Sequence, residues 1–331
     1  NKYGLIMATY KEIKGTQIEV LASDPSNPVE GQVWYNSTSS VLKGQATITA
    51  GAWSSGGNLN TGRLGIMSAV NGTQTAALGA GGNPGSGPEI TNKTELYDGT
   101  SWTEVNDLNQ AREGGGGAGT QTAALVFGGT RQAQPGGPNV VSTESWNGTN
   151  WTEVNDLQAA NSRMAGAGTQ TSALSFSGGG NTANTELYNG TNWTEVNNLN
   201  TGRSNSSGAG ADNTSAICVG GETPSVTANA ELWNGTNWTE VNNLNTARDR
   251  LTTIGIATSA LSAGGEPGNT VTELFNGTNW TEQNDLSTTR AFASGAGTAT
   301  AGLVFGGGPA VTATEEWNGA GAGVTRTFTD S

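Results

Sequence analysis

One stretch of this chain returns several times almost unchanged. It reads NGTNWTEVNDL from Asn147, and close copies begin at Asp98, Asn189, Asn234 and Asn276. Each copy follows an apolar run that ends in Gly-Gly, and each precedes an Arg. Copies of one supersecondary unit bury their apolar faces against one another. The sequence therefore predicts a repeat architecture for residues 46–331, which we expect to form one domain.

Three marks keep the same register in six repeats. The Trp of the recurring stretch stands at Trp53, Trp102, Trp151, Trp193, Trp238 and Trp280. An Arg follows it at Arg63, Arg112, Arg163, Arg203, Arg248 and Arg290. Gly-Gly pairs begin at Gly81, Gly128, Gly178, Gly220, Gly264 and Gly306. Because the three series stay in step, we expect six structural units.

Each repeat divides into four segments with the features of β-strands. A small-residue segment such as RMAGAGTQT suits a crowded inner strand, and an apolar run such as AALVFGG fits a strand buried on both faces. TELYNG or TELWNG comes third, where Asn-Gly supplies the positive φ angles of a tight hairpin. NWTEVNNL is expected to be an outer strand with an inward Trp. Four antiparallel strands in about 40–50 residues predict an all-β, six-bladed β-propeller.

The two ends of the repeat region complement each other. The last repeat ends at EEWNG without a WTEVN stretch, whereas AGAWSSGGNL, which contains Trp53, precedes the first repeat. We predict that this N-terminal strand completes the last blade and closes the ring, because closure removes exposed sheet edges. In the alternative, the C-terminal GVTRTFTDS is the missing strand and Trp53 packs elsewhere.

Residues 1–45 lie outside the repeats and are predicted to form an attachment arm. SDPSNPVEGQ has two prolines and is typical of an extended or turn-rich segment, while VWYNSTSSVLKG predicts a hairpin. This arm is too small to bury a core of its own, so we expect it to pack on the repeats or on another protein. The start, NKYGLIMATYKEIKG, has too short an apolar stretch for a secretory signal, and Met7 is a candidate natural start.

Composition argues against several classes of function. The net charge of −13 argues against a nucleic-acid surface, which needs clustered Lys and Arg. No apolar run reaches the roughly 18 residues of a membrane span. The chain has no His, which is the commonest general base and metal ligand, and its single Cys218 lies in the apolar run AICVGG. We expect Cys218 to be buried, and we expect no metal site, no cofactor and no membrane insertion.

The order of Gly-Gly, the aromatic residue of TELY or TELW, the later Trp and the following Arg resembles the kelch repeat of β-propellers. The resemblance covers about residues 46–318 and implies a propeller fold. It says almost nothing about function, because propellers host unrelated activities. The segment SDPSNPVEGQVWYNSTSSVLKG and the Asn-, Thr- and Gly-rich repeats are similar to tail-fibre or decoration proteins of tailed bacteriophages, which implies a virion component.

The repeated Trp and Arg residues are expected to be structural. The six Arg accompany six Glu of the third strand, at Glu95, Glu144, Glu186, Glu231, Glu273 and Glu315. The functional alternative is a charged ring around the channel that binds an anion. We favour Arg–Glu or Arg–carbonyl contacts that tie blades together, because Arg is suited to forked contacts and every blade repeats the pair.

Catalysis is not expected. Kelch-like copper oxidases use Tyr, His and a modified Cys, and sialidase propellers carry Asp-box turns resembling Ser-x-Asp-x-Gly-x-x-Trp. The turn Asn-Gly-Thr-Asn-Trp departs from that box, and no cluster of Asp, Glu, Tyr and Arg stands out. Asn-x-Thr triplets at Asn150, Asn192, Asn237 and Asn279 would carry glycans in a secreted eukaryotic protein; we favour a role in the hairpin turn only.

One asymmetry indicates a binding surface. The loop between the second and third strands varies among repeats, whereas the other turns barely change. Variation confined to one face of a rigid scaffold is typical of binding, although drift of unconstrained loops explains it equally well. The candidate binding residues in these loops are Asn83, Glu89, Asn92, Arg131, Gln134, Asn139, Glu222 and Glu266.

These observations favour a non-enzymatic structural or adhesion component of a tailed-phage virion. The propeller is then the exposed binding or decoration module, with a host-surface glycan or receptor as candidate ligand. Residues 1–45 are expected to contact other virion proteins, and homo-oligomers are expected on a symmetric particle. The alternatives are a secreted or cell-surface propeller that binds glycans and, less favoured, a glycan-processing enzyme.

Overall fold

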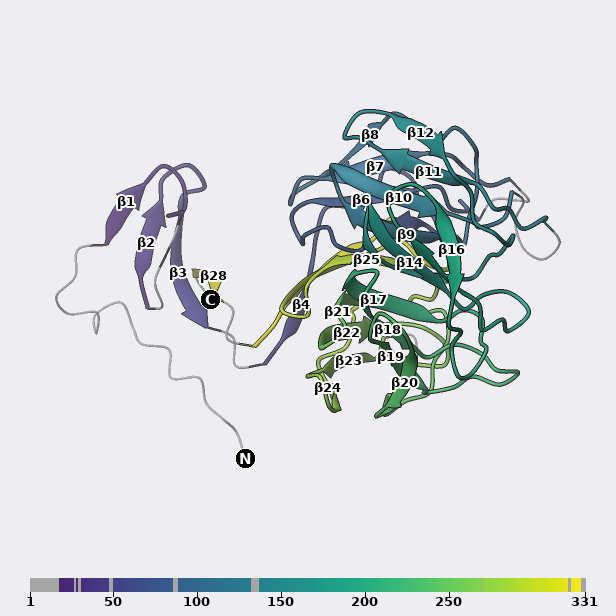
Figure 1. The fold of residues 1–331 in the computed structure, drawn as a ribbon. Helices are drawn as coiled ribbons and strands as arrows, with labels where there is room; N and C mark the ends of the chain where they lie inside the picture. The colour runs from purple at the N-terminus through teal and green to yellow at the C-terminus, as the bar shows by residue number, and fades with distance from the viewer. Residues whose placement is uncertain are drawn as a thin grey trace. The chain divides into compact units, whose positions relative to one another are not determined.

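The computed structural model describes residues 18–26, 28, 31–47, 50–85, 89–131, 137–268, 270–320 and 323–328. In this part of the chain the helices and strands assigned are all β-strands, and they form seven four-stranded sheets. The chain divides into two compact units, Asn1–Thr49 with Ala320–Ser331, and Ala50–Gly319. The first unit contains one sheet, called the arm sheet below. The second contains the other six, called sheets 1 to 6 (Figure 1).

Sheets 1 to 3 each take four consecutive strands, paired antiparallel. Sheet 1 consists of β5 (Met67–Ser68), β6 (Ala77–Ala80), β7 (Thr94–Tyr97) and β8 (Trp102–Val105). Sheet 2 consists of β9 (Gly116–Thr120), β10 (Ala123–Phe127), β11 (Thr143–Trp146) and β12 (Trp151–Val154). Sheet 3 consists of β13 (Ala165–Thr169), β14 (Ser172–Phe176), β15 (Thr185–Tyr188) and β16 (Trp193–Val196).

Sheets 4 and 5 repeat this pattern, and sheet 6 differs in the origin of one strand. Sheet 4 consists of β17 (Ser207–Asp212), β18 (Ser215–Val219), β19 (Ala230–Trp233) and β20 (Trp238–Val241). Sheet 5 consists of β21 (Thr252–Ile256), β22 (Ser259–Ala263), β23 (Thr272–Phe275) and β24 (Trp280–Glu282). Sheet 6 consists of β25 (Ser294–Gly297), β26 (Ala301–Phe305), β27 (Thr314–Asn318) and β4 (Ala52–Ser55).

The predicted pairing of the Trp53 strand with the last repeat is confirmed. Trp53 of β4 lies opposite Trp317 of β27, and their ring centroids are 5.2 Å apart. The alternative for GVTRTFTDS is wrong: its strand β28 (Gly323–Phe328) pairs with β3 (Val41–Thr47) of the arm sheet instead. All six residues of β28 have partners in β3. Residues 320–331 therefore group with the arm, whereas we expected them to belong with residues 46–319.

The arm sheet orders its strands β1 (Glu19–Leu21), β2 (Val33–Asn36), β3 and β28, with β1 parallel to β2. The hairpin predicted in VWYNSTSSVLKG is β2–β3. Trp34 is fully buried, and its indole N–H donates to Asp24 Oδ1 at 3.0 Å. Lys43, followed by Asn36, lowers the pKa of Asp24 to about 2. The arm thus buries an aromatic side chain, although we expected residues 1–45 to be too small to bury a core.

The first strands of sheets 1 to 6 lie against one another in a propeller-like arrangement. β9 contacts β5 and β13, β17 contacts β13 and β21, and β25 contacts β21 and β5. Where β9 meets β5 the backbones approach too closely for a side chain, as predicted from the Gly content of this segment. A Cβ added to Gly117 would stand 2.2 Å from the carbonyl oxygen of Ser68 in the neighbouring sheet. Glycine is therefore required at this contact, whereas β21 carries the larger Thr252, Thr253 and Ile254.

The repeated Trp residues connect neighbouring sheets. Indole N–H groups donate to Thr hydroxyls in the adjacent sheet, from Trp102 to Thr314, Trp151 to Thr94, Trp193 to Thr143, Trp238 to Thr185 and Trp53 to Thr272, at 3.0–3.1 Å. Trp280 donates to the carbonyl of Asn242 instead, because the equivalent position in sheet 4 is Ala230, which has no hydroxyl. Except for the half-buried Trp53, these rings are at most 6% exposed, as a structural role requires.

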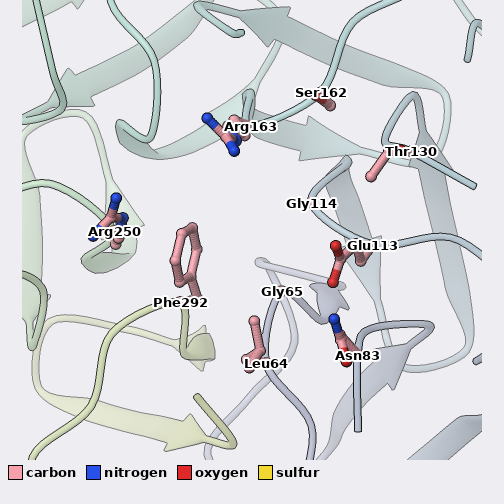
Figure 2. Close-up of a pocket in the computed structure, with 10 residues that line it drawn as sticks. All are labelled: Leu64, Gly65, Asn83, Glu113, Gly114, Thr130, Ser162, Arg163, Arg250 and Phe292. Carbon is pink, nitrogen blue, oxygen red and sulfur yellow. The ribbon is translucent and has the colours of Figure 1, made fainter. Parts of the chain in front are cut away.

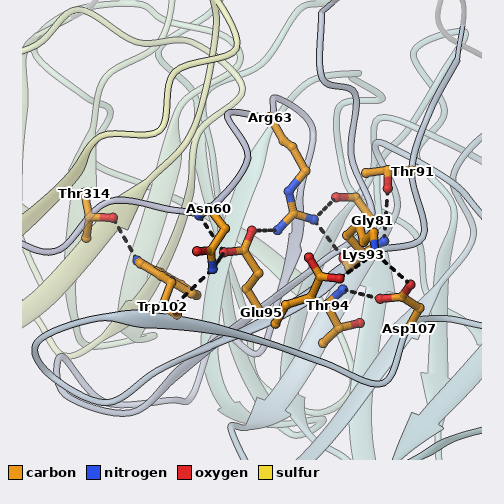
Figure 3. A network of polar contacts seen from close by, with 11 residues as sticks. Asn60, Arg63, Gly81, Thr91, Lys93, Thr94, Glu95, Trp102, Asp107 and Thr314 are labelled. Carbon is orange, nitrogen blue, oxygen red and sulfur yellow. Dashed lines mark hydrogen bonds and ion pairs between the residues drawn. The ribbon is translucent and has the colours of Figure 1, made fainter.

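Five of the repeated Arg residues form buried ion pairs with the third-strand Glu of the same repeat. The pairs are Arg63–Glu95, Arg112–Glu144, Arg203–Glu231, Arg248–Glu273 and Arg290–Glu315, at 2.5–3.0 Å. Figure 3 shows the first pair, in which Glu95 also accepts from the backbone and side-chain amides of Asn60. The pairs are thus structural, as we favoured, but each fixes the connection that enters its own sheet and does not tie two sheets together.

The sixth member of this Arg series is not Arg163. The carbonyl groups of Arg63, Arg112, Arg203, Arg248 and Arg290 each accept from a glycine N–H of the preceding repeat, and the equivalent acceptor in sheet 3 is Asn161. The side chain of Asn161 donates to the carbonyl of Ser177 at 2.7 Å. Aligning the repeats on Arg therefore placed Arg163 two residues out of register. The third repeat has Asn at the position where the other repeats have Arg.

Glu186, the carboxyl of that repeat, accepts only backbone amides from this connection, those of Gln158 and Ala159, at 2.7 and 3.2 Å. Burial raises the pKa of Glu186. A carboxyl with a raised folded pKa stabilises the fold below its unfolded pKa of about 4.3, and this contribution is lost as the pH rises through the folded pKa. We therefore expect Glu186→Gln to make the free energy of unfolding depend less on pH. At pH 7 it should lose less stability than removal of a carboxylate from an ion pair, because the amide oxygen can still accept from Gln158 and only the weaker contact with Ala159 is lost.

Urea denaturation at pH 4 and pH 7 measures this effect. Glu144→Gln is the matched control, because it leaves the charged and buried Arg112 without its anion and is expected to destabilise the protein. Equal losses of stability at pH 7 in the two variants would contradict our interpretation of Glu186.

Candidate binding site

Six equivalent residues, each two positions beyond the Arg or Asn161, surround the start of the first strands. They are Gly65, Gly114, Arg163, Asn205, Arg250 and Phe292, and we call them the mouth ring. All have φ between 53° and 63°. The N–H of each donates to the carbonyl of the member before it, and the N–H of Gly65 donates to the carbonyl of Phe292, at 2.6–3.0 Å. These six hydrogen bonds form a cycle of main-chain contacts.

The left-handed conformation makes the side chains of the mouth ring unusual. Glycine adopts such φ values freely, whereas a non-glycine residue there costs on the order of 1–3 kcal/mol. Arg163, Arg250 and Phe292 have this conformation despite its energetic cost, and Asn205 tolerates it better than most residues. The neighbouring Trp and Glu positions repeat almost without change, but the mouth ring carries chemically unlike groups. Positions of this kind gather at functional sites.

A pocket of about 310 Å³ opens at the mouth ring. Its ten lining residues are Leu64, Gly65, Asn83, Glu113, Gly114, Thr130, Ser162, Arg163, Arg250 and Phe292, and we call it the central pocket. Figure 2 shows the carboxylate of Glu113 and the ring of Phe292 on different sides of the same space, with Arg163 above them. Ligand pockets commonly combine apolar surface with a few convergent polar groups, and this pocket has both.

Arg250 is held by carboxylates on one side of the central pocket. Its Nη1 pairs with Glu266, and its Nε lies 3.3 Å from Asp249 Oδ2. The guanidinium carbon also lies over the ring of Phe292, 5.1 Å from the centroid, which is the geometry of a cation–π contact. Burial raises the pKa of Asp249, and Arg250 opposes this shift. The arrangement leaves Arg250 rigid and its charge compensated.

Asn205 lies below the mouth, where a second cavity also contacts Arg163, Arg250 and Phe292. The residue is 5% exposed, and neither its Oδ1 nor its Nδ2 has a hydrogen-bond partner among the described residues. Buried amides normally have partners, because an unmet donor or acceptor costs about 1–3 kcal/mol. Asn205 therefore presents a donor and an acceptor to the inside of the cavity.

The opposite ends of the first strands are bridged by the turn that follows β5. Asn71 Nδ2 donates to the carbonyls of Gly168 in sheet 3 and Ala211 in sheet 4, at 3.0 and 3.2 Å. Its own N–H donates to Gly119 of sheet 2 at 2.9 Å. One residue of repeat 1 thus ties three other repeats at the end away from the mouth ring. The first strands of sheets 1 to 4 are therefore linked at both ends, by the mouth ring and by Asn71.

The candidate binding residues of the variable loops have separate locations. Asn83 lines the central pocket, Glu266 holds Arg250, and Glu222 bridges to Ser204, which precedes Asn205. The others have different contacts: Glu89 is exposed, Asn92 donates to Leu108, Arg131 donates to Gln110, and Asn139 accepts from Ser162. Gln134 lies outside the described residues.

Most residues of the central pocket were missed by our sequence reasoning. Glu113, Ser162, Arg250, Phe292 and the glycines lie in the short link between the repeated Arg and the first strand. The signal was present in the sequence, because the second residue after the Arg position changes from Gly to Asn, Arg or Phe while its surroundings repeat. We looked for variation only in the long loops.

The remaining findings concern the thiol of Cys218, metal sites, membrane spans and similarity to known proteins. Cys218 is fully buried, as predicted, and burial raises its pKa. In the described ranges, no group of three or more Cys, His, Asp or Glu residues could hold a metal ion. A helix long and apolar enough to cross a membrane is likewise not found among the described residues. No protein-family model matches the chain, and no curated protein matches it significantly.

Proposed function

We propose that Ala50–Gly319 form a closed six-bladed, kelch-like β-propeller that acts as a non-enzymatic binding module of a tailed-phage virion. The cycle of hydrogen bonds through the mouth ring and the pairing of β4 with β27 support closure. The main support for a binding function is a contrast between two sets of residues. The Trp and Arg–Glu contacts repeat among the sheets, whereas the side chains of the mouth ring differ from one another. A scaffold that needed only stability would use glycine at all six positions.

The central pocket favours binding over catalysis. Most glycoside hydrolases use two carboxyl groups about 5–9.5 Å apart. Among the ten residues that line the central pocket, only Glu113 is acidic. Its neighbours Arg163 and Arg250 can orient a ligand but do not supply the second carboxyl. The glycan-binding alternative remains compatible with the same pocket, so the two proposals differ in where the protein is located.

The arm sheet supports the proposed attachment to a particle. Among the described residues, its edge strands β1 and β28 each have one neighbour, and they carry the exposed apolar side chains of Val20 (68%) and Phe328 (52%). Such edges accept a further strand from a partner or a second copy. The similarity of residues 23–44 to phage structural proteins gives the kind of partner, other virion proteins, and a symmetric particle favours homo-oligomeric contacts.

Mass spectrometry of purified particles should find the chain in the virion. Removal of both arm segments, residues 1–49 and 320–331, should then abolish incorporation while residues 50–319 still fold. Both must be removed, because loss of β3 alone would leave β28 unpaired. Arg163→Gly in the full chain is the control and should be incorporated normally. Absence from particles, or normal incorporation of the truncated protein, would refute the attachment proposal.

A further inference from the structure

We infer that the central pocket, together with the second cavity that shares Arg163, Arg250 and Phe292 with it, binds one neutral sugar unit, a polyol the size of a single pyranose. Its polar contacts are Arg163 and Glu113 in the central pocket and Asn205 in the second cavity, and Phe292 is the apolar wall. This inference rests on the proposed binding function and assigns it a place and a ligand class. A volume of about 310 Å³ is at the low end of the roughly 300–1,000 Å³ of known ligand pockets. It suits one ring better than an extended chain.

The polar groups match a ring of hydroxyls. A sugar hydroxyl donates one hydrogen bond and accepts others, so adjacent hydroxyls need donors and acceptors side by side. Arg163 and Glu113 place a guanidinium group and a carboxylate in the lining of the central pocket. In the second cavity, Asn205 adds a donor and an acceptor from an amide whose atoms have no partner in the described part of the chain. These groups are mounted on neighbouring repeats within the cycle of main-chain bonds.

The aromatic wall suits the other side of a sugar ring. The face of an aromatic ring carries partial negative charge and attracts weakly positive C–H groups. Arg250 covers one face of Phe292, and Glu266 and Asp249 fix Arg250 in turn. A ligand that enters the pocket can therefore use the remaining face, in the space shared with Glu113 (Figure 2).

The charges argue against a strongly ionic ligand. The charged residues that line the pocket are Arg163, Arg250 and Glu113, and Arg250 is already paired with Asp249 and Glu266 outside the lining. An anion would meet the carboxylate of Glu113, and a cation would meet the guanidinium group of Arg163. A neutral polyol uses both signs as hydrogen-bond partners and repels neither.

Glycine substitution provides a clean test, because Gly65 and Gly114 already show that glycine fits the mouth ring. Arg163→Gly and Asn205→Gly remove the side chains and keep the conformation, so both should fold and melt near the parent. Glu240→Gln, on the exposed outer strand of sheet 4, is the control. Saturation-transfer NMR on the full chain would use methyl glycosides of glucose, galactose, mannose and N-acetylglucosamine. Glucosamine serves as the cationic probe and N-acetylneuraminic acid as the anionic one.

We expect at least one neutral glycoside to bind the parent and the Glu240→Gln protein, and both glycine variants to weaken it about tenfold or more. Equal binding by all variants would place the sugar elsewhere and overturn the inference, while leaving the proposed binding function intact. Binding of only the charged probes, or of none at all, would also overturn it. The incorporation test on particles decides the virion proposal independently of these results.

Discussion

Arg112→Met is expected to lower the free energy of unfolding by about 3–5 kcal/mol, because removal of one partner leaves a buried charge without compensation. Arg112 and Glu144 are both completely buried, and their atoms Nη2 and Oε1 are 2.5 Å apart. Nη1 also donates to the carbonyl of Ser142 at 2.6 Å. Burial lowers the pKa of Arg112, a shift that Glu144 opposes, so the pair depends on both members. Denaturant unfolding followed by Trp fluorescence measures the loss.

The double variant Arg112→Met/Glu144→Leu separates the buried charge from the packing. Apolar replacement of a whole buried pair is often close to neutral, so this protein should regain much of the lost stability. Recovery should be incomplete, because Asn109 donates from its backbone and its side chain to Glu144 Oε2 and would lose both hydrogen bonds. A single variant within about 1 kcal/mol of the parent would show that solvent reaches the site, against the usual loss for a buried pair.

Trp193→Ala should be similarly damaging, at about 3–5 kcal/mol for truncation of a buried Trp. The ring is 2% exposed and packs against Phe127 and Tyr188, with centroids 4.7 and 5.0 Å away. Its N–H donates to Thr143 of sheet 2 at 3.1 Å. The substitution therefore opens a cavity between two sheets and also removes their hydrogen bond.

Trp193→Phe tests these two contributions separately. It keeps most of the ring but leaves Thr143 without the indole donor, so we expect a loss of about 1–2 kcal/mol. Trp53→Ala provides the comparison on a half-buried ring and should cost less than Trp193→Ala. Thermal melting of the three variants gives the order. A melting temperature for Trp193→Ala within a degree or two of the parent would contradict the burial on which the argument depends.

The strands of the repeats could be predicted because each local signal agrees with the fold. The four β segments of each repeat and the inward Trp follow from sequence-local rules. In the Asn-Gly turns only the glycine has the expected positive φ, as at Gly148. The placement of Trp53 opposite Trp317 was also predictable, because one repeat lacked a strand and the chain offered one spare. Long-range pairing is accessible to sequence reasoning when a repeat defines what is missing.

The errors arose where a residue left the pattern. Arg163 matched the Arg series by letter but belongs to the mouth ring by geometry, since Asn161 holds the equivalent place. Residues 323–328 resembled a fourth strand but found a partner in the arm. A pattern identifies the shared scaffold, whereas the residues of the mouth ring that we propose for binding depart from it. The central pocket could not be predicted, because its members are scattered over several repeats and meet only when the first strands come together.

The chain crosses between the arm and the repeat unit twice, and this has a mechanical consequence. Asn318 and Ala52 lie opposite each other at one end of the β27–β4 pair, and Thr47 lies opposite Gly323 on the arm side. Tension applied to the arm therefore enters β27 and β4 together, in the same direction. Neither strand is drawn past the other, so their hydrogen bonds are not sheared or peeled one by one. In the attachment that we propose for the arm, two such tethers share a pulling force that a single tether would carry alone.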